Sequence, residues 1–268
     1  MYQKQKEIQK RYEGFLRTNS LWKNNSIFGL TQFEFSRNPI NFDFEIDNKL
    51  RLGKYIEQFL FYHLKSNNFK ILFENIQIQN KKITLGELDC ILVSESKIIH
   101  LEVVYKFYLY DETIGNSEID HFIGPNRKDC LIDKLNKLEQ KQLPLLYSDN
   151  CKLFLTAKGL NVDFIEQQVC FLAQLFIPYK KKINLNNLNP DSIAGYYISY
   201  IDLEIFSNLK FYIPVKKDWL VIPHQNISWL KFDEFKVELK EYMNRKFSPL
   251  CWLKKQNGEI FKIFITWW

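Results

Sequence analysis

The sequence predicts an α/β fold whose core runs in the order helix, three-stranded meander, helix, strand. Apolar residues recur at helical spacing from about residue 50 to 65. Three β-type runs follow, separated by short polar turns at 80–82 and 94–97. A second helical pattern at 127–142 then precedes another apolar run at 151–157. A helical extension at the N-terminus and a β-rich C-terminal region complete the predicted fold.

The extension is predicted at residues 1–45. Its first part, 1–20, is charged and places apolar side chains on one helical face. Its second part, 23–48, is rich in Asn, Phe and Ser and contains Pro39, so we expect an irregular connection. The apolar helical face consists of Ile8, Tyr12, Phe15 and Leu16.

The core is predicted to span residues 46–160. Its first helix has one apolar face and ends at the asparagine pair 67–68. The three strands are predicted at 71–79, 83–93 and 98–110, because each is an apolar run bounded by turn residues. The helical face consists of Leu52, Ile56, Phe59, Leu60 and Leu64.

A second helix and a fourth strand are predicted to close the core. Asn126 is a good N-cap for the helix at 127–142, and Pro144 ends that helix. The apolar run at 151–157 is predicted to be a buried strand. The region 161–268 is expected to be rich in β-strands and aromatic residues and to pack on the core. Its elements are apolar stretches at 169–179, 193–205, 209–215 and 219–222, a helix at 235–245 and a last strand at 260–267.

Composition describes an ordinary globular chain with a net charge of +6 and 46% hydrophobic residues. This mild positive charge favours a polyanion only through non-specific attraction. Five cysteines without a CxxC pair and four dispersed histidines argue against a zinc site and favour reduced thiols. We find neither an N-terminal apolar region nor an apolar run of about 18 residues, so neither a signal peptide nor a membrane span is expected. The expected location is the cytoplasm.

Acidic residues on two neighbouring strands form the main candidate site. Side chains at even separations share a strand face, so Glu87 and Asp89 point the same way, as do Glu102 and Lys106. If the strands pair around the turn at 94–97, Asp89 falls opposite Glu102. Carboxylates in buried strands are costly unless a cation accompanies them, so this pair predicts Mg²⁺ or Mn²⁺.

Further residues extend this site. Glu57, on the preceding helix, is expected to reach the same metal as a third ligand. Lys106 is expected to position or activate the attacking water. Glu87 is expected to lie behind the metal ligands or to pair with Lys106.

The order of elements, with one acid on the second strand and Glu and Lys on the third, resembles the PD-(D/E)XK nucleases, also called restriction-endonuclease-like. More closely, the chain resembles an uncharacterised bacterial family, the domain of unknown function 1853 (DUF1853), from about residue 51 onward. The segments that carry this resemblance are Arg51–Glu57, Leu85–Asp89, Glu102–Leu109, Gly124–Asp129 and Gln142–Leu145.

The resemblance implies a restriction-endonuclease-like core and metal-dependent cleavage of nucleic acid. Asp89 and Glu102 match the metal-binding acids of the superfamily. Glu57 matches the glutamate of its first core helix, and Lys106 matches its lysine. Leu88 stands where the name-giving proline would be, a common variation.

The spacing between the second acid and the lysine departs from the superfamily. One residue usually separates them, whereas three separate Glu102 from Lys106, and Val104 takes the usual lysine position. Strand parity keeps Lys106 on the same face but about 6.6 Å further along. Lys134 or Lys137 on the following helix could replace it.

The segment around the second helix supplies candidate contacts to nucleic acid. Lys134 and Lys137 lie on the helix. Arg127 at a helix N-terminus is unfavourable for the helix dipole, so it could hold a phosphate or a carboxylate there. Asn126 is expected to contact a phosphate or, alternatively, to cap the helix.

The predicted function is Mg²⁺-dependent hydrolysis of phosphodiester bonds, with DNA favoured over RNA and no nucleotide cofactor. A second interpretation, which the wide Glu–Lys spacing favours, is a nuclease-like fold that binds nucleic acid or a protein without cutting. A third is a structural or regulatory module whose acids no longer bind metal. The sequence leaves the oligomeric state open.

Overall fold

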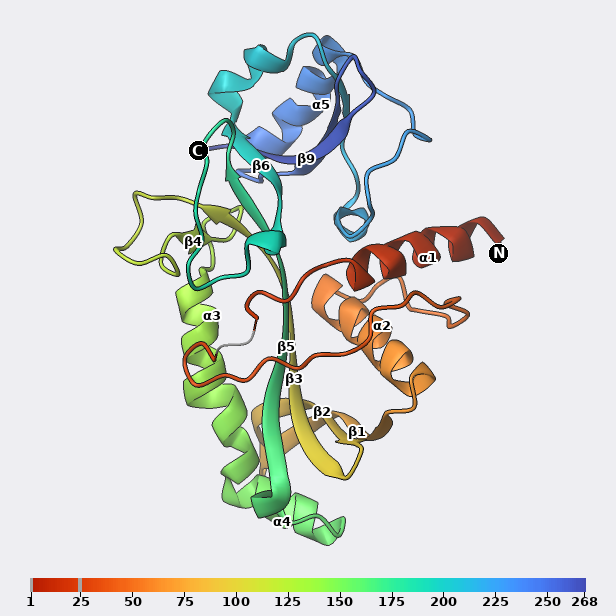
Figure 1. Ribbon diagram of the computed structural model, residues 1–268, viewed down its shortest axis with the longest axis vertical. Helices are drawn as coiled ribbons and strands as arrows, with labels where there is room; N and C mark the ends of the chain where they lie inside the picture. Colours follow the sequence, from red (N-terminus) through yellow and green to blue (C-terminus); the bar gives the residue numbers. More distant parts are fainter. Residues whose placement is uncertain (1, 24–25) are drawn as a thin grey trace.

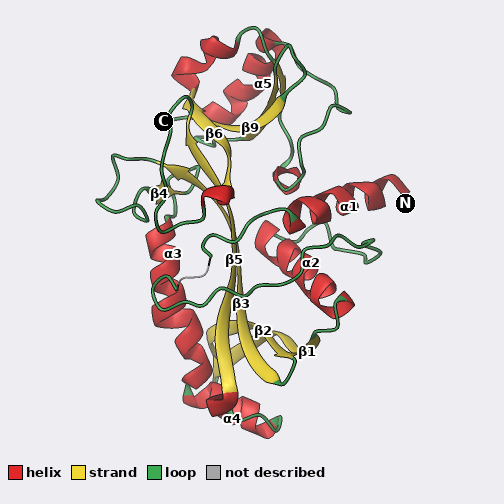
Figure 2. Ribbon diagram, in the orientation of Figure 1, coloured by secondary structure: helices red, strands yellow, loops and turns green. Residues whose placement is uncertain are grey.

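A mixed β-sheet forms the centre of the molecule and has helices on both faces (Figures 1 and 2). The computed structural model describes residues 2–23 and 26–268. The helices are α1 (Tyr2–Leu16), α2 (Leu52–Ser66), α3 (Leu131–Lys137), α4 (Asp149–Ala157) and α5 (Phe232–Asn244). The strands are β1 (Lys70–Asn80), β2 (Ile83–Ser94), β3 (Lys97–Tyr110), β4 (Phe122–Ile123), β5 (Ile165–Pro178), β6 (Ile193–Ser199), β7 (Lys210–Tyr212), β8 (Leu250–Lys254) and β9 (Ile260–Thr266).

The sheet order places the predicted meander at one edge. Over the described residues the sheet has nine strands in the order β1-β2-β3-β5-β6-β9-β8-β7, with β4 paired to β3. Figure 1 shows α1 and α2 on one side of the long β3–β5 pair and α3 on the other. The predicted α/β class is confirmed.

The first helix and the three-stranded meander lie where the sequence predicts them. α2 buries Ile56, Phe59 and Leu60 against the sheet. β1, β2 and β3 pair antiparallel in sequence order. The two turns between them have Lys81 and Glu95 at a φ of 55°, the left-handed conformation that two-residue hairpin turns require.

The predicted strand at 151–157 is wrong, because this segment forms α4. The Ser148 side chain accepts a hydrogen bond from Cys151 N at 3.3 Å and caps the helix N-terminus. Cys151 and Leu155, four residues apart, are buried, while Leu153 is 72% exposed. A strand would place all three side chains on one face, so this burial pattern identifies a helix.

β5 takes the place of the predicted fourth strand. It runs parallel to β3, with Ile98 beside Ile165 at one end and Leu109 beside Phe176 at the other. The connection between these strands carries α3 and α4. The predicted domain boundary at residue 160 therefore falls between α4 and β5. Strands of the same sheet lie on both sides of this boundary.

The second core helix begins later than the sequence predicts. α3 starts at Leu131, with Cys130 in the N-cap position, so Asn126 does not cap it. A π-helical turn (Leu138–Gln142) and a 3₁₀ turn (Leu143–Tyr147) continue the helix past the predicted end. Since Pro144 lies in the first turn of that 3₁₀ segment, it begins a helical turn instead of ending one.

The N-terminal extension covers one edge of β5. Leu21 N donates to Phe171 O and Phe33 N donates to Val169 O, both at 2.9 Å. This edge of β5 is left open by β6, whose pairing with β5 begins only at Leu175. The extension thus satisfies backbone groups that would otherwise form an exposed sheet edge.

The C-terminal region continues the same sheet. β6 and β9 are parallel, and β8 pairs antiparallel with β7 and β9. The predicted helix at 235–245 and last strand at 260–267 are confirmed by α5 and β9. β8 was not predicted, because its apolar run is short, and Lys216–Trp219 is a 3₁₀ turn.

Two further expectations concern membrane spans and thiols. Among the described helices, none is long and apolar enough to cross a bilayer. All five cysteines are free, and all except Cys130 are buried.

A close backbone contact at Gly14 holds α1 against the C-terminal region. A Cβ atom at this position would lie 1.9 Å from Leu220 O. We therefore expect Gly14→Ala to lower the free energy of unfolding by about 1–3 kcal/mol. Gly53→Ala in α2 is the matched control, because its added Cβ would meet no neighbouring segment within 4 Å. Helix propensity predicts that this control is unchanged or stabilised by up to about 1 kcal/mol. Denaturant unfolding compares the two variants, and equal stabilities would contradict the proposed contact.

Candidate functional site

The candidate site lies at a fork in the sheet, where β2 and β3 separate. Their pairing ends with Cys90 opposite Leu101, and beyond it β2 continues along β1 while β3 continues along β5. In this register Asp89 and Glu102 are the next facing positions. The predicted pairing around the turn at 94–97 is therefore confirmed, and both acids lie just beyond the last pair.

Three carboxylates converge at this fork. One oxygen each of Glu57, Glu87 and Asp89 lies within 4.8 Å of the others. Glu57 comes from α2, whereas Glu87 and Asp89 alternate along β2 and so share a face. Asp89 Oδ2 accepts a hydrogen bond at 2.9 Å from Val103 N, a donor beyond the end of the β2–β3 ladder. Asp89 and Glu57 are buried, which makes their charges costly.

Lys54 of α2 lies among these three carboxylates. Its Nζ is 2.9 Å from Glu57 Oε2 and 4.0 Å from Asp89 Oδ1, and it also forms an ion pair with Glu87. It donates a further hydrogen bond to Asn75 Oδ1 at 2.7 Å. Burial by itself lowers the pKa of Lys54, but the hydrogen bonds to Glu87 and Glu57 raise it above its usual value. One ammonium thus faces three carboxylates.

Asp89 and Glu57 have raised affinities for protons. Burial is the main cause that raises the pKa of Asp89, and repulsion from Glu102 adds to it, bringing this pKa to about 8. Burial also raises the pKa of Glu57, against the opposing effect of Lys54. Buried carboxylates that lack matching positive charge bind either protons or cations. The fork can therefore attract a cation.

Glu102 is fully buried and is held by a separate network of hydrogen bonds. Its oxygens accept from His100 Nε2 at 3.1 Å and from Gln142 Nε2 at 2.5 Å. Gln167 Nε2 donates to His100 Nδ1 at 3.0 Å. Because Nδ1 accepts, the hydrogen of a neutral imidazole lies on Nε2 and points at Glu102. These bonds fix the orientation of the Glu102 carboxylate beside the fork.

Lys134 reaches this network from α3. Its Nζ donates to Gln142 Oε1 at 2.7 Å, so a single amide side chain connects it to Glu102. Burial lowers the pKa of Lys134 to about 8, although attraction to Glu102 and Asp89 opposes this effect. This amine can therefore gain or lose a proton near neutral pH.

The two other predicted lysines lie in different surroundings. Lys106 Nζ donates to Asp129 Oδ2 at 2.6 Å, in a partly exposed ion pair. The predicted pairing of Lys106 with Glu87 is therefore not formed, since Glu87 pairs with Lys54. Lys137 is exposed on α3.

Arg127 and Asn126 lie before α3 and make contacts within the protein. Arg127 has a φ of 55° and pairs with Asp111 at 3.0 Å. Its guanidinium also lies 4.4 Å from the ring centre of Trp268. Asn126 Oδ1 accepts from Ser248 N at 2.7 Å. Arg127 thus holds a carboxylate, one of its two predicted partners, while Asn126 anchors the C-terminal region.

The sequence-based prediction omits three residues that shape this site. Lys54 precedes Glu57 by one helical turn, and His100 precedes Glu102 by two strand positions. Gln142 begins one of the segments that carry the family resemblance. The spacing of His100 and Glu102 on one strand face is a usable signal. The side-chain network itself depends on long-range contacts that the sequence does not display.

The chain is similar in sequence to a protein family of unknown function. It matches the domain of unknown function DUF1853 over residues 9–263. It is also 27% identical over 157 residues to an uncharacterized protein of Acanthamoeba polyphaga mimivirus. That stretch is 57% of this chain but only 13% of the viral protein's own length. No solved structure matches the chain. Since the family match covers nearly all of the sequence, the chain belongs to the DUF1853 family.

Proposed function

We propose that this chain is a metal-dependent nuclease that hydrolyses phosphodiester bonds and prefers DNA to RNA. The observation that carries the proposal is the convergence of Glu57, Glu87 and Asp89 within 4.8 Å at the fork of the sheet. Two of the three are buried, and carboxylates at this separation repel one another unless positive charge lies between them. Mg²⁺ and Mn²⁺ prefer such oxygen ligands.

The order of elements supports a restriction-endonuclease-like core. α2 precedes the β1–β2–β3 meander, and β5 returns parallel to β3 after the helices. The resemblance of the sequence to the PD-(D/E)XK nucleases implies this order, with acids on the second and third strands. In this proposal the fork between β2 and β3 is the active site.

The chemistry of the fork fits a divalent cation. Glu57 Oε2 is buried and is contacted by a positive charge, the Lys54 ammonium, at 2.9 Å. Glu57, Glu87 and Asp89 would hold the ion. Glu102 accepts two hydrogen bonds and retains further lone pairs, so it can contribute as the resemblance implies. A bound Mg²⁺ would polarise a phosphoryl oxygen and supply hydroxide at neutral pH.

In this proposal Lys134 has the role of the superfamily's lysine, which positions or activates the attacking water. Its amine has a pKa of about 8 and can hold or release a proton near the reacting groups. Gln142 orients that amine relative to Glu102. Lys106, the lysine that the resemblance implies, is instead engaged by Asp129.

A second candidate function is binding of nucleic acid or of a protein without cleavage. Two observations favour it. Lys54 already places a positive charge among the acids, and Lys106 pairs with Asp129 outside the three-carboxylate cluster. In this case the ion pairs of Lys54 would be a permanent part of the fold, and added metal would not stabilise it.

Cleavage assays on the purified chain distinguish the two functions. Supercoiled plasmid, linear duplex DNA, single-stranded DNA and RNA are incubated with Mg²⁺ or Mn²⁺, with a chelator as the blank. The proposal predicts cleavage that requires metal and is faster on DNA than on RNA. Metal should also raise the melting temperature, because an ion that binds only the folded state stabilises it by mass action.

Two results of these assays would contradict a catalytic function. If all four substrates survive and the melting temperature does not change with Mn²⁺, the nuclease proposal is wrong. If nucleic acid binds without being cut under the same conditions, the second function is supported.

A further inference from the structure

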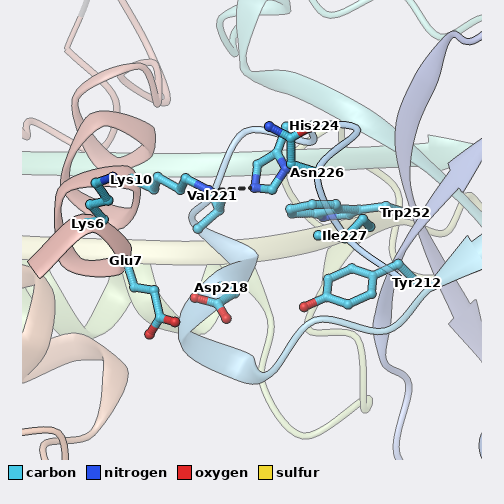
Figure 3. Close-up of a pocket in the computed structure, with 10 residues that line it drawn as sticks. All are labelled: Lys6, Glu7, Lys10, Tyr212, Asp218, Val221, His224, Asn226, Ile227 and Trp252. Carbon is cyan, nitrogen blue, oxygen red and sulfur yellow. Dashed lines mark hydrogen bonds between the residues drawn. The ribbon is translucent and has the colours of Figure 1, made fainter. Parts of the chain in front are cut away.

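The fork differs from the cavity between α1 and the C-terminal region in its ratio of acids to lysines (Figure 3). That cavity, of about 480 Å³, is lined by two lysines, Lys6 and Lys10, and by two acids, Glu7 and Asp218. Its lysines and acids are equal in number, so it needs no further cation. At the fork one lysine, Lys54, faces three carboxylates. The fork therefore keeps an excess of negative charge.

The Lys54 ammonium lies where a metal ion would have to bind. Its Nζ is 2.9 Å from Glu57 Oε2, contacts Glu87 Oε1 and is 4.0 Å from Asp89 Oδ1. Mg²⁺ binds oxygen at about 2.1 Å, so an ion on that Glu57 oxygen would lie at most about 5 Å from Nζ. Two positive charges at this distance repel each other strongly in a partly buried site. The ammonium and the ion therefore compete for the same carboxylates.

Lys54 can leave the carboxylates without a change in the backbone. Its side chain is 41% exposed, and a flexible four-carbon stem joins the ammonium to the first turn of α2. Its Nζ also donates a hydrogen bond to Asn75 Oδ1 at 2.7 Å. The Asn75 amide is neutral, so it can keep the ammonium as a partner when another cation takes the carboxylates.

Charge determines which cations can replace Lys54. A monovalent ion brings only the charge that the ammonium already supplies, and it would have to replace the ion pairs that Lys54 makes with Glu57 and Glu87. A divalent ion doubles the positive charge that faces the three carboxylates. Occupation by Lys54 thus favours divalent over monovalent ions.

We propose that Lys54 occupies the cation position of the metal-free fork, competes there with Mg²⁺ or Mn²⁺, and excludes monovalent ions. This inference rests on the proposed function, because it concerns the ion that the nuclease would use. Lys54 is then the residue that determines cation specificity at the fork. Its ion pairs belong to the metal-free state and are exchanged for those of the ion.

Calorimetric titration of Mn²⁺ into Lys54→Met tests the competition. Met keeps the apolar stem and removes the ammonium. Since the metal-free site is then no longer occupied, the affinity for Mn²⁺ should rise at least about tenfold over that of the unaltered chain. Lys65→Met is the matched control, because Lys65 lies on the same helix and pairs with Glu74 of β1 at 2.6 Å, outside the three-carboxylate cluster. Its affinity should stay within about twofold.

Displacement of Lys54 can also be measured in the unaltered chain, which removes any dependence on the folding of a variant. The protein is treated briefly with an amine-acylating reagent, with and without Mg²⁺, and acylated lysines are quantified by mass spectrometry. Acylation of Lys54 should rise at least about threefold with Mg²⁺, because its ammonium loses its carboxylate partners to the ion. Acylation of Lys65 should not change.

The exclusion of monovalent ions has its own test. Melting temperatures are compared in sodium chloride and in tetramethylammonium chloride at equal concentration. Na⁺ is small enough to enter the emptied site of Lys54→Met, so this variant should melt at a higher temperature in sodium chloride. The unaltered chain and Lys65→Met should show no such difference. An equal response of all three proteins would overturn the proposed specificity.

The outcomes separate this inference from the proposed function. Equal or weaker Mn²⁺ binding by a folded Lys54→Met variant would overturn the inference and leave the nuclease proposal in place. Unchanged Lys54 acylation at Mg²⁺ concentrations that saturate the unaltered chain would do the same. Binding by Lys54→Met but not by the unaltered chain would support the competition and contradict the nuclease proposal. Absence of binding in both would contradict both.

Discussion

Asp89→Asn is expected to lower metal-dependent cleavage at least about a thousandfold, because it removes one of the two buried carboxylates of the three-carboxylate cluster. The amide has the same shape as the carboxyl, and its oxygen can still accept the hydrogen bond from Val103 N. The fold should therefore survive. The measurement is the initial rate of plasmid cleavage in Mn²⁺ for protein purified in parallel with the unaltered chain.

Glu166→Gln is the matched control for that variant. Glu166 lies on β5 in a surface ion pair with Lys97, so its loss should leave cleavage within about twofold. Equal cleavage by Asp89→Asn and the unaltered chain would identify a contaminating nuclease and remove the enzymatic proposal. A large loss in both variants would indicate damage to the fold.

The same substitution has a predicted effect on stability in the absence of metal. The pKa of Asp89 is raised from 3.8 to about 8, so between these values the folded chain binds a proton that the unfolded chain has released. The contribution of Asp89 to the free energy of unfolding therefore falls as pH rises through this window. Asp89→Asn should remove that decline, and denaturant unfolding at several pH values measures it.

Lys134→Met is expected to reduce cleavage about a hundredfold, the usual contribution of a well-placed proton-transfer group. Met retains much of the apolar stem, so packing of α3 should change little. Lys106→Met should reduce the rate by less than about threefold, because its partner Asp129 is partly exposed and the pair is a surface contact. Single-turnover cleavage rates at saturating protein compare the two variants.

The opposite ranking of these variants would have a clear meaning. If Lys106→Met abolishes cleavage and Lys134→Met does not, the lysine implied by the superfamily resemblance is the functional one. The contact between Lys106 and Asp129 would then have to open when substrate binds. Lys137→Met, on the exposed side of α3, is the control for a general loss of positive charge.

The sequence predicts the strand register at the fork because the two strands are joined by a short turn. Counting outward from the turn at 94–97 is enough to place Asp89 opposite Glu102, and the observed pairs agree. The approach of Glu57 is predictable for a similar reason, since α2 directly precedes the meander. Local connections thus determine the part of the site that the sequence reveals.

The remainder depends on contacts that form only in the folded chain. Lys54 reaches Glu87 across 33 positions, and Gln142 reaches Glu102 across 40. The orientation of the Glu102 carboxylate depends on its hydrogen bonds to Gln142 and His100, which cannot be predicted from the alternation of side chains along a strand. The segment at 151–157 is misassigned because a short apolar run fits both the strand period and the helix period. The side chain of Ser148, which caps the N-terminus of α4, indicates the helix.

Calorimetric titration of Mn²⁺ into the purified chain tests the central proposal most directly, because it reports the ion without requiring the right nucleic acid. Convergence of Glu57, Glu87 and Asp89 predicts one saturable site per chain. Affinity should fall at least about tenfold in Asp89→Asn and remain unchanged in Glu166→Gln. Absence of binding to the unaltered chain, or equal affinity in Asp89→Asn, would contradict a metal site at the fork.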